Sequence, residues 1–159
     1  MKDSQAGFSL IELLVVVAII LIVAAIAIPN LMRARMSANE SSAAQSIRTI
    51  NTAEMSYFNT YPQTGFATLG ALGGAQPCTP AIATGCFLDN FLANASVAPG
   101  KDGYTFTIIA PSLSGYTSLA NPVGLNTSGS RSFCSDQTGV IYSLAGALGC
   151  TPATGVPLQ

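Results

Sequence analysis

The chain has 159 residues, of which only 8% are charged, and its formal net charge is -1. Its six basic residues, spread from Lys2 to Arg131, cannot neutralise a row of phosphates, so no nucleic-acid partner is indicated. Histidine is absent, which removes the commonest general base and the commonest metal ligand. We therefore expect no enzyme activity, no catalytic residues, no cofactor and no metal site.

The first predicted element is a long apolar segment. Residues 13–28 are apolar without interruption, and the stretch from Phe8 to Pro29 has 22 residues broken only by Ser9 and Glu12. As a helix it would be about 33 Å long, which matches a hydrocarbon core of about 30 Å. Because it is apolar on every side, it predicts a membrane segment or a signal peptide rather than a helix in a globular core.

Two simple interpretations of this segment leave Glu12 unexplained. A secretory signal would be cut after Ala27, at the small residues of positions 25–27, and would leave a secreted binding module that begins at Ile28. A plain membrane anchor explains the length alone. A carboxylate in a membrane helix costs about 2.5–3.5 kcal/mol on insertion scales and usually has a designated partner.

A third interpretation supplies that partner. Residues 7–13, GFSLIEL, resemble the leader junction of type IV pilins and type II secretion pseudopilins. The resemblance implies that a prepilin peptidase cuts between Gly7 and Phe8 and that Phe8 is then N-methylated. It also implies that Glu12 meets the N-terminal ammonium of a neighbouring subunit and sets the assembly register. Pro29, where this family often carries a proline, is interpreted as a helix kink.

The segment after Pro29 continues as a helix. Neither Pro nor Gly occurs from residue 30 to residue 58, and Ala43, Ile47, Ile50 and Tyr57 recur on one helical side. Glu40, Gln45, Arg48, Asn51 and Asn59 are predicted to lie largely on the other sides. We expect one helix over residues 9–58 and divide the chain into a leader, an apolar half-helix, an amphipathic half-helix and a head: 1–7, 8–29, 30–60 and 61–159.

The head is predicted to be a small antiparallel sheet. Pro62 ends the helix, and residues 62–103 form a loop rich in Gly, Ala, Thr and Pro, with a helical turn at 88–92. Phe87, Leu88, Phe91 and Leu92 are predicted on one side of that turn. Three or four strands are expected within residues 104–110, 115–122 and 132–144, the last range folded as a hairpin around Gly139. The predicted fold is α+β, a pilin-like lollipop with a long helix packed on a small sheet.

Four cysteines lie in the head and none in the apolar segment. An even number in a small Gly-rich and Ser-rich region suggests two disulfides and an oxidising compartment. Three pairings are possible, and the alternative of a four-thiolate zinc site has unusual spacing. We favour Cys78 with Cys86 and Cys134 with Cys150, because each pair closes a local loop.

These features favour a structural subunit over a binding module. The resemblance implies a precursor in the bacterial inner membrane with its head on the periplasmic side, processed by prepilin peptidase and assembled into an extracellular helical filament of identical subunits. An assembly ATPase and a platform protein are partners implied by the family. A type IV pilus subunit, acting in motility, adhesion, surface attachment or DNA uptake, is favoured, and a type II secretion pseudopilin is the alternative.

Overall fold

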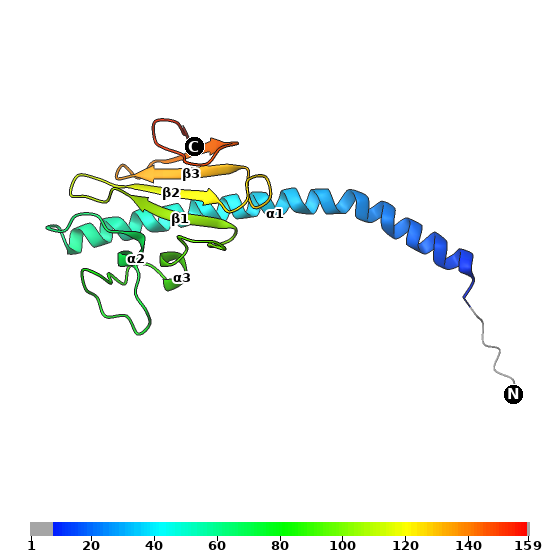
Figure 1. Ribbon diagram of the computed structural model, residues 1–159, viewed down its shortest axis with the longest axis horizontal. Helices are drawn as coiled ribbons and strands as arrows, with labels where there is room; N and C mark the ends of the chain where they lie inside the picture. The colour runs from blue at the N-terminus through cyan, green and yellow to red at the C-terminus, as the bar shows by residue number, and fades with distance from the viewer. Residues whose placement is uncertain (1–7, 159) are drawn as a thin grey trace. The chain divides into compact units, whose positions relative to one another are not determined.

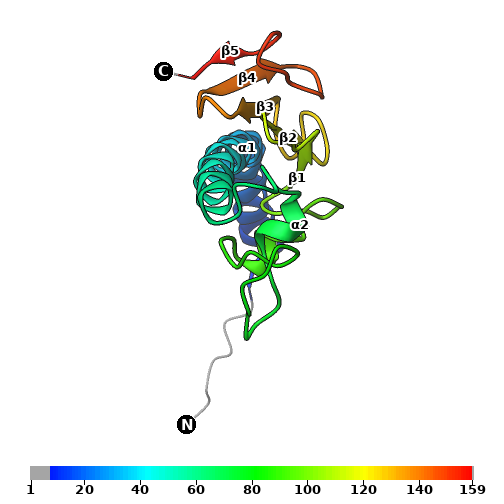
Figure 2. The same ribbon diagram turned by 90° about the vertical axis from the view of Figure 1, so that its left-hand side faces the viewer.

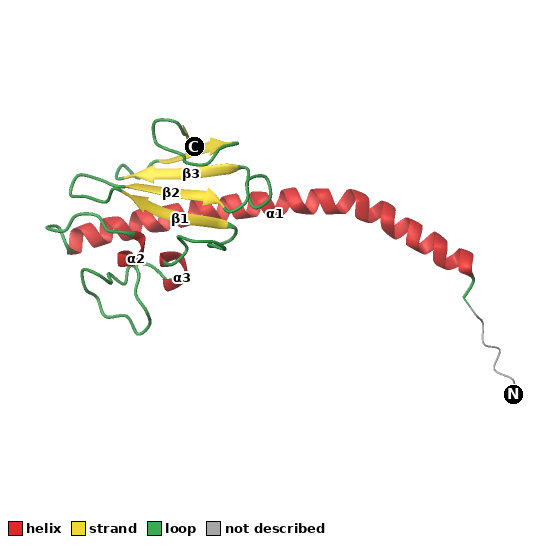
Figure 3. Ribbon diagram, in the orientation of Figure 1, coloured by secondary structure: helices red, strands yellow, loops and turns green. Residues whose placement is uncertain are grey.

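The computed structural model describes residues 8–158 and contains a long helix followed by an antiparallel sheet (Figures 1 and 3). The fold is α+β, as predicted, and the chain forms two compact units that divide between Ala34 and Arg35. The elements are α1 (Leu10–Thr60), α2 (Leu69–Leu72), α3 (Asn90–Ala93), β1 (Tyr104–Ile109), β2 (Thr117–Pro122), β3 (Arg131–Asp136), β4 (Ile141–Ala145) and β5 (Val156–Pro157).

Helix α1 has identifiable signals at both ends. At its start the Ser9 carbonyl accepts hydrogen bonds from the backbone N–H groups of Glu12 and Leu13, at 3.1 and 3.2 Å. At its end the last helical residue is Thr60, two positions before Pro62. The helix stops there because Tyr61, which directly precedes the proline, is disfavoured in helical conformation. The prediction of one helix over residues 9–58 is confirmed, with boundaries that differ by one and two residues.

The strands form one sheet in chain order, β1-β2-β3-β4-β5, and each neighbouring pair is antiparallel. Phe106 of β1 is paired with Ala120 of β2, which is paired in turn with Phe133 of β3. The hairpin predicted around Gly139 is confirmed: its φ of +77° lies in the left-handed region that favours glycine, and its N–H donates to Asp136 O at 3.0 Å. The two-residue strand β5 was not predicted, because a Val-Pro pair carries no alternating pattern.

The main core lies between the inner face of this sheet and residues 43–57 of α1. Ala43, Ile47, Ile50 and Tyr57 are each buried, which confirms the predicted apolar side of the amphipathic half-helix. Figure 2 shows the strands following one another around this part of α1. The largest side chains that the sheet adds to this core are those of Tyr104, Phe106 and Phe133.

The helical turn predicted at residues 88–92 is present as α3, but its orientation differs from the expectation. Leu88 and Leu92 are buried, whereas the side chain of Phe91 is 64% exposed. The helix begins at Asn90, after its N-cap Asp89, so Phe91 sits on the outer side of a single turn. The prediction that Phe91 lies on one side of the turn with Leu88 and Leu92 is therefore wrong, because the interval 87–92 is not one continuous helix.

Candidate functional site

The first part of α1 exposes an unbroken apolar surface. Among the described residues α1 alone is long and apolar enough to cross a membrane. Its large side chains from Leu10 to Met32 are exposed, and Phe8, which precedes the helix, is 78% exposed. A helix that presents apolar side chains on every side is stable only in lipid or against other apolar helices. We therefore expect lipid or other apolar helices to cover this segment.

Glu12 is the one charged residue on the apolar part of this helix. It lies in the first turn of α1 and its side chain is exposed. In that first turn a carboxylate is favoured by the helix dipole. Within the described residues no basic group lies within 4.0 Å of it. The predicted cleavage residue Gly7 and the leader 1–7 lie outside the described residues.

Pro29 lies within α1, and the helix continues on both sides of it. A proline inside a helix removes one backbone donor from the hydrogen-bond ladder. This loss affects the Ala25 carbonyl, and at the next position the Asn30 side-chain amide donates to Ile26 O at 3.1 Å. The kink at Pro29 stays a prediction.

A buried carboxylate fastens α1 to the start of β3. Glu40 Oε1 accepts hydrogen bonds from the Ser130 N–H and hydroxyl at 2.8 and 2.7 Å, and Glu40 Oε2 accepts two from Arg131. Burial alone would raise the pKa of the Glu40 carboxyl, but the Ser130 and Arg131 hydrogen bonds and the Arg131 charge hold the pKa below its usual value. Sequence periodicity placed Glu40 away from the core side, and that prediction is wrong.

Asn51 forms a second buried polar contact between helix and sheet. Its amide donates to Ser135 Oγ at 2.7 Å, and its carbonyl oxygen accepts from the Tyr116 hydroxyl at 3.0 Å. The Ser118 hydroxyl adds a longer bond to the same oxygen at 3.4 Å. Asn51 was also predicted to lie off the core side. Each polar group here finds a partner from a different strand or loop, which sequence spacing could not reveal.

Glu54 is fully buried, three residues further along α1. Its Oε2 accepts from the Ala67 N–H at 2.9 Å, whereas its Oε1 has no hydrogen-bond partner among the described residues. Burial raises the pKa of this carboxyl to about 7, although the Ala67 hydrogen bond opposes the shift. Its charge would also raise the pKa values of the Tyr57 and Tyr116 hydroxyls, each of which is already raised first by burial.

The four cysteines form two disulfides in the favoured pairing. Cys78 is bonded to Cys86 and Cys134 to Cys150, across 8 and 16 residues, and no free cysteine lies in the described part of the chain. The second bond lies on the outer face of the sheet, where Leu119, Cys134 and Cys150 form a separate small cluster. It therefore holds the C-terminal segment against the face of the sheet opposite α1.

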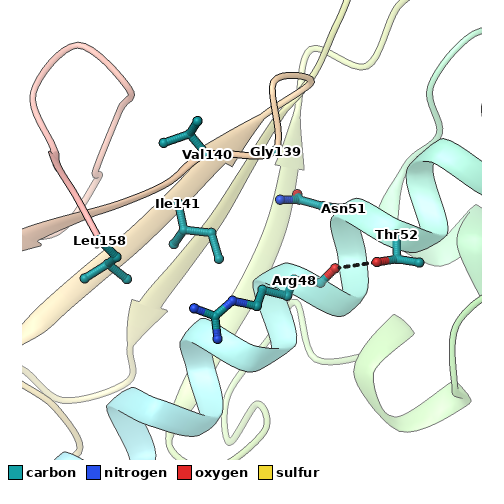
Figure 4. Close-up of a pocket in the computed structure, with 7 residues that line it drawn as sticks. All are labelled: Arg48, Asn51, Thr52, Gly139, Val140, Ile141 and Leu158. Atoms are coloured by element: carbon teal, nitrogen blue, oxygen red, sulfur yellow. Dashed lines mark hydrogen bonds between the residues drawn. The ribbon is translucent and has the colours of Figure 1, made fainter.

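A groove of about 440 Å³ lies on the head beside α1 (Figure 4). Arg48 and Thr52 of α1 line one wall, and Val140, Ile141 and Leu158 line the other. The Arg48 side chain is exposed, and its Nη1 donates to Gln45 Oε1 at 3.3 Å. No acidic group of the described residues lies within 4.0 Å of it. The groove therefore combines one apolar wall with a guanidinium that has no acidic partner among the described residues.

Comparison with known proteins supports the predicted resemblance. Residues 2–28 match the family model described as the prokaryotic N-terminal methylation motif. The chain is 47% identical to the type IV major pilin protein PilA of Myxococcus xanthus over 53 residues, which is 33% of this chain and 24% of the relative. It is 63% identical to the type IV wide pilus major component PilA4 of Thermus thermophilus over 35 residues, 22% of this chain and 27% of the relative. The matched segments span about a quarter of each relative.

Proposed function

We propose that this chain is a structural subunit of a type IV pilus, made as a membrane-held precursor and assembled into a filament of identical copies. The observation that carries the proposal is the match of residues 2–28 to the N-terminal methylation motif, on a chain whose α1 exposes an apolar surface. The names of both relatives, a type IV major pilin and a wide pilus major component, support a pilus over a secretion pseudopilus.

In the proposed mechanism the apolar half of α1 exchanges lipid contacts for contacts with the same half of other subunits. Both environments are apolar, so the large exposed side chains from Phe8 to Met32 stay out of water throughout the transfer. The precursor is held in the inner membrane with its head on the periplasmic side. A prepilin peptidase, an assembly ATPase and a platform protein act on it.

Glu12 sets the register in this mechanism. Cleavage between Gly7 and Phe8 creates an ammonium at Phe8, and Glu12 becomes the fifth residue of the mature chain. A buried carboxylate and a buried ammonium are each costly alone, and they stabilise each other when they meet across two subunits. The pair therefore favours one stagger of neighbouring helices over all others.

The test is intact-mass and N-terminal peptide analysis of the protein isolated from its native cells. The proposal predicts a chain that begins with N-methylated Phe8. A mature chain that begins at Ile28, or an uncut chain that begins at Met1, would contradict it. Electron microscopy with an antibody to the head then separates long surface filaments, expected for a pilus, from the absence of surface filaments, expected for a pseudopilus.

A further inference from the structure

An aromatic side chain and a carboxylate lie together on the surface of α3. Phe91 is 64% exposed, and Asp89, two residues earlier, is exposed as well. Asp89 Oδ1 accepts from the Leu92 N–H at 2.9 Å and so caps α3. No basic group of the described residues lies within 4.0 Å of Asp89. An exposed aromatic side chain and an exposed carboxylate therefore lie two residues apart at the start of α3.

The groove beside Arg48 has the complementary properties. Its apolar wall, formed by Val140, Ile141 and Leu158, faces the exposed guanidinium of Arg48 across a volume of about 440 Å³. That volume lies in the range of sites that enclose an organic group, and an aromatic side chain is much smaller. A ligand that fits this groove presents an apolar group beside an anion.

Most other acidic side chains of the head already have a partner or are buried, so few are free to pair with Arg48. Glu40 is paired with Arg131, and Asp102 lies beside Lys101 and accepts from the Ser42 hydroxyl. Glu54 is buried, and the Asp136 carboxylate is held by Thr138 in the hairpin turn next to the groove itself. Among the acids of residues 35–158, Asp89 is therefore the exposed one with no basic side chain within 4.0 Å.

The same comparison can be made for the basic residues that could pair with Asp89. Lys101 and Arg131 already have acidic neighbours. Arg35 lines a different cleft that also contains Asp102, so an acid is already present there. Of the basic side chains on the described head, Arg48 is the one that combines apolar surroundings with no acid in its groove.

The two surfaces lie towards opposite edges of the sheet. The segment after α3 is bonded to β1, because Phe106 N–H donates to Ala95 O at 2.8 Å, and β1 is one edge of the sheet. The groove is formed at β4, next to the other edge strand β5. Figure 2 shows α2 and its neighbouring loops near β1, away from β4 and β5. A contact between two different surfaces of identical subunits repeats without closing when it builds a helix.

We propose that Phe91 of one subunit inserts into the Arg48 groove of the next copy of this chain, with Asp89 placed against the Arg48 guanidinium. This inference rests on the proposed filament function and assigns it a specific head-to-head contact. The aromatic ring covers Val140, Ile141 and Leu158, and the charge pair selects the orientation. On a chain with 8% charged residues, one such pair is a large part of the available electrostatic specificity.

The first test is a charge exchange in cells that make the protein, with filaments sheared from the surface and measured relative to total subunit. Arg48→Asp and Asp89→Arg are each expected to lower filament yield on the order of tenfold, and the double variant to restore it. Because Asp89→Arg also removes the α3 N-cap, Asp89→Asn, which can still cap, is tested beside it. Phe91→Ser should lower the yield, whereas Leu113→Ser, at an equally exposed leucine (62%), should not.

A second test reads the contact directly. Filaments of Arg48→Lys keep the positive charge and gain an amine, and a carbodiimide then joins that amine to the Asp89 carboxylate. Mass spectrometry is expected to find this cross-linked peptide in a subunit dimer. Normal filament yield from the single variants, or a double variant no better than either single, would overturn the contact while leaving the filament function intact. A wild-type chain that makes no filament would instead overturn the filament function and the contact with it.

Discussion

Arg131 donates from Nε and from Nη2 to a single oxygen of Glu40, at 2.8 and 2.6 Å, and so joins β3 to α1. The carboxylate is nearly inaccessible to solvent, whereas the Arg131 side chain is 43% exposed. Ser130 occupies the second carboxylate oxygen with two further bonds. Since these four bonds are made to the charged form, Glu40 stabilises the attachment of the sheet to the helix as a carboxylate.

Glu40→Ala is expected to lower the free energy of unfolding of the full chain in detergent micelles by about 2–4 kcal/mol, because it leaves the Ser130 donors without their acceptor. The matched change is Arg131→Lys, which keeps the charge but loses the two-pronged geometry and should cost less. Thermal and urea unfolding followed by circular dichroism measure both. Equal stability of Glu40→Ala and the parent chain would show that the cluster does not hold the head to the helix.

Glu54 predicts a pH dependence of opposite sign to that of Glu40. Its folded pKa of about 7 lies above its ordinary value of 4.5, so between these values the folded chain binds a proton that the unfolded chain releases. Its contribution to stability is therefore fully present below about pH 4.5 and is lost as the pH rises to about 7. Glu40, whose pKa is lowered, acts in a separate window: its contribution is present above about pH 4.5 and is lost as the pH falls further.

Glu54→Gln should remove the loss of stability that occurs as the pH rises from 4.5 to about 7. We expect the parent chain to lose on the order of 3 kcal/mol between pH 4.5 and pH 8 and the variant to lose much less, because an amide does not ionise. Unfolding midpoints measured across that range test it, with Asp136→Asn as a control at a half-buried turn carboxylate. Tyr57 and Tyr116, the titratable groups that face Glu54, ionise well above this range. Parallel curves for parent and Glu54→Gln would contradict the prediction.

The sequence was informative wherever a repeating pattern reflected a repeating contact. Ala43, Ile47, Ile50 and Tyr57 were predicted as one buried side, since a helix against a sheet buries side chains at intervals of three and four. Glu40 and Asn51 were misplaced because their burial depends on partners far away in the chain, Ser130 and Ser135. A polar residue in such a pattern is assigned to solvent unless the partner is known.

The groove beside Arg48 was beyond sequence reasoning for a related cause. One wall comes from α1, and the other comes from β4 and Leu158, which lie much later in the chain. No local spacing connects Arg48 with Ile141. By contrast, the motif at residues 7–13 could be recognised from the sequence alone, because its residues are contiguous in the chain.

A substitution at Ile47 tests whether the apolar side predicted for residues 43–57 forms the core. Its side chain is completely buried between α1 and the sheet, so Ile47→Ala is expected to cost about 2–5 kcal/mol through lost burial and a residual cavity. Ile82→Ala removes the same atoms at a site that is 56% exposed and should change stability by less than about 1 kcal/mol. Similar losses from the two variants, measured by urea unfolding, would contradict the assignment of Ile47 to the core.

The disulfide between Cys134 and Cys150 should contribute to stability. Replacing both cysteines with serine is expected to lower the free energy of unfolding by about 3 kcal/mol, given a separation of 16 residues. The matched pair is Cys78 with Cys86, where the shorter loop of 8 residues predicts a loss of about 2.5 kcal/mol. Because Cys134 also packs with Leu119 under the C-terminal segment, protease sensitivity after residue 145 should rise only in the first variant. Unchanged cleavage there would show that the bond does not hold this segment.

Glu12 gives the sharpest test of assembly. Glu12→Ala removes a carboxylate for which no basic partner is found among the described residues of the same chain, so it should not destabilise the isolated subunit. We expect the variant to be inserted and cleaved normally, since the apolar segment becomes more apolar, but to yield at least tenfold less filament. The isosteric Glu12→Gln separates charge from shape and should fail to assemble in the same way.

Membrane fractionation and the mass of the mature N-terminus report insertion and cleavage, while sheared-filament yield reports assembly. Filament yield from Glu12→Ala equal to that of the parent chain would mean that an ammonium–carboxylate pair does not set the register, and the contact beside Arg48 would then have to carry the specificity of assembly.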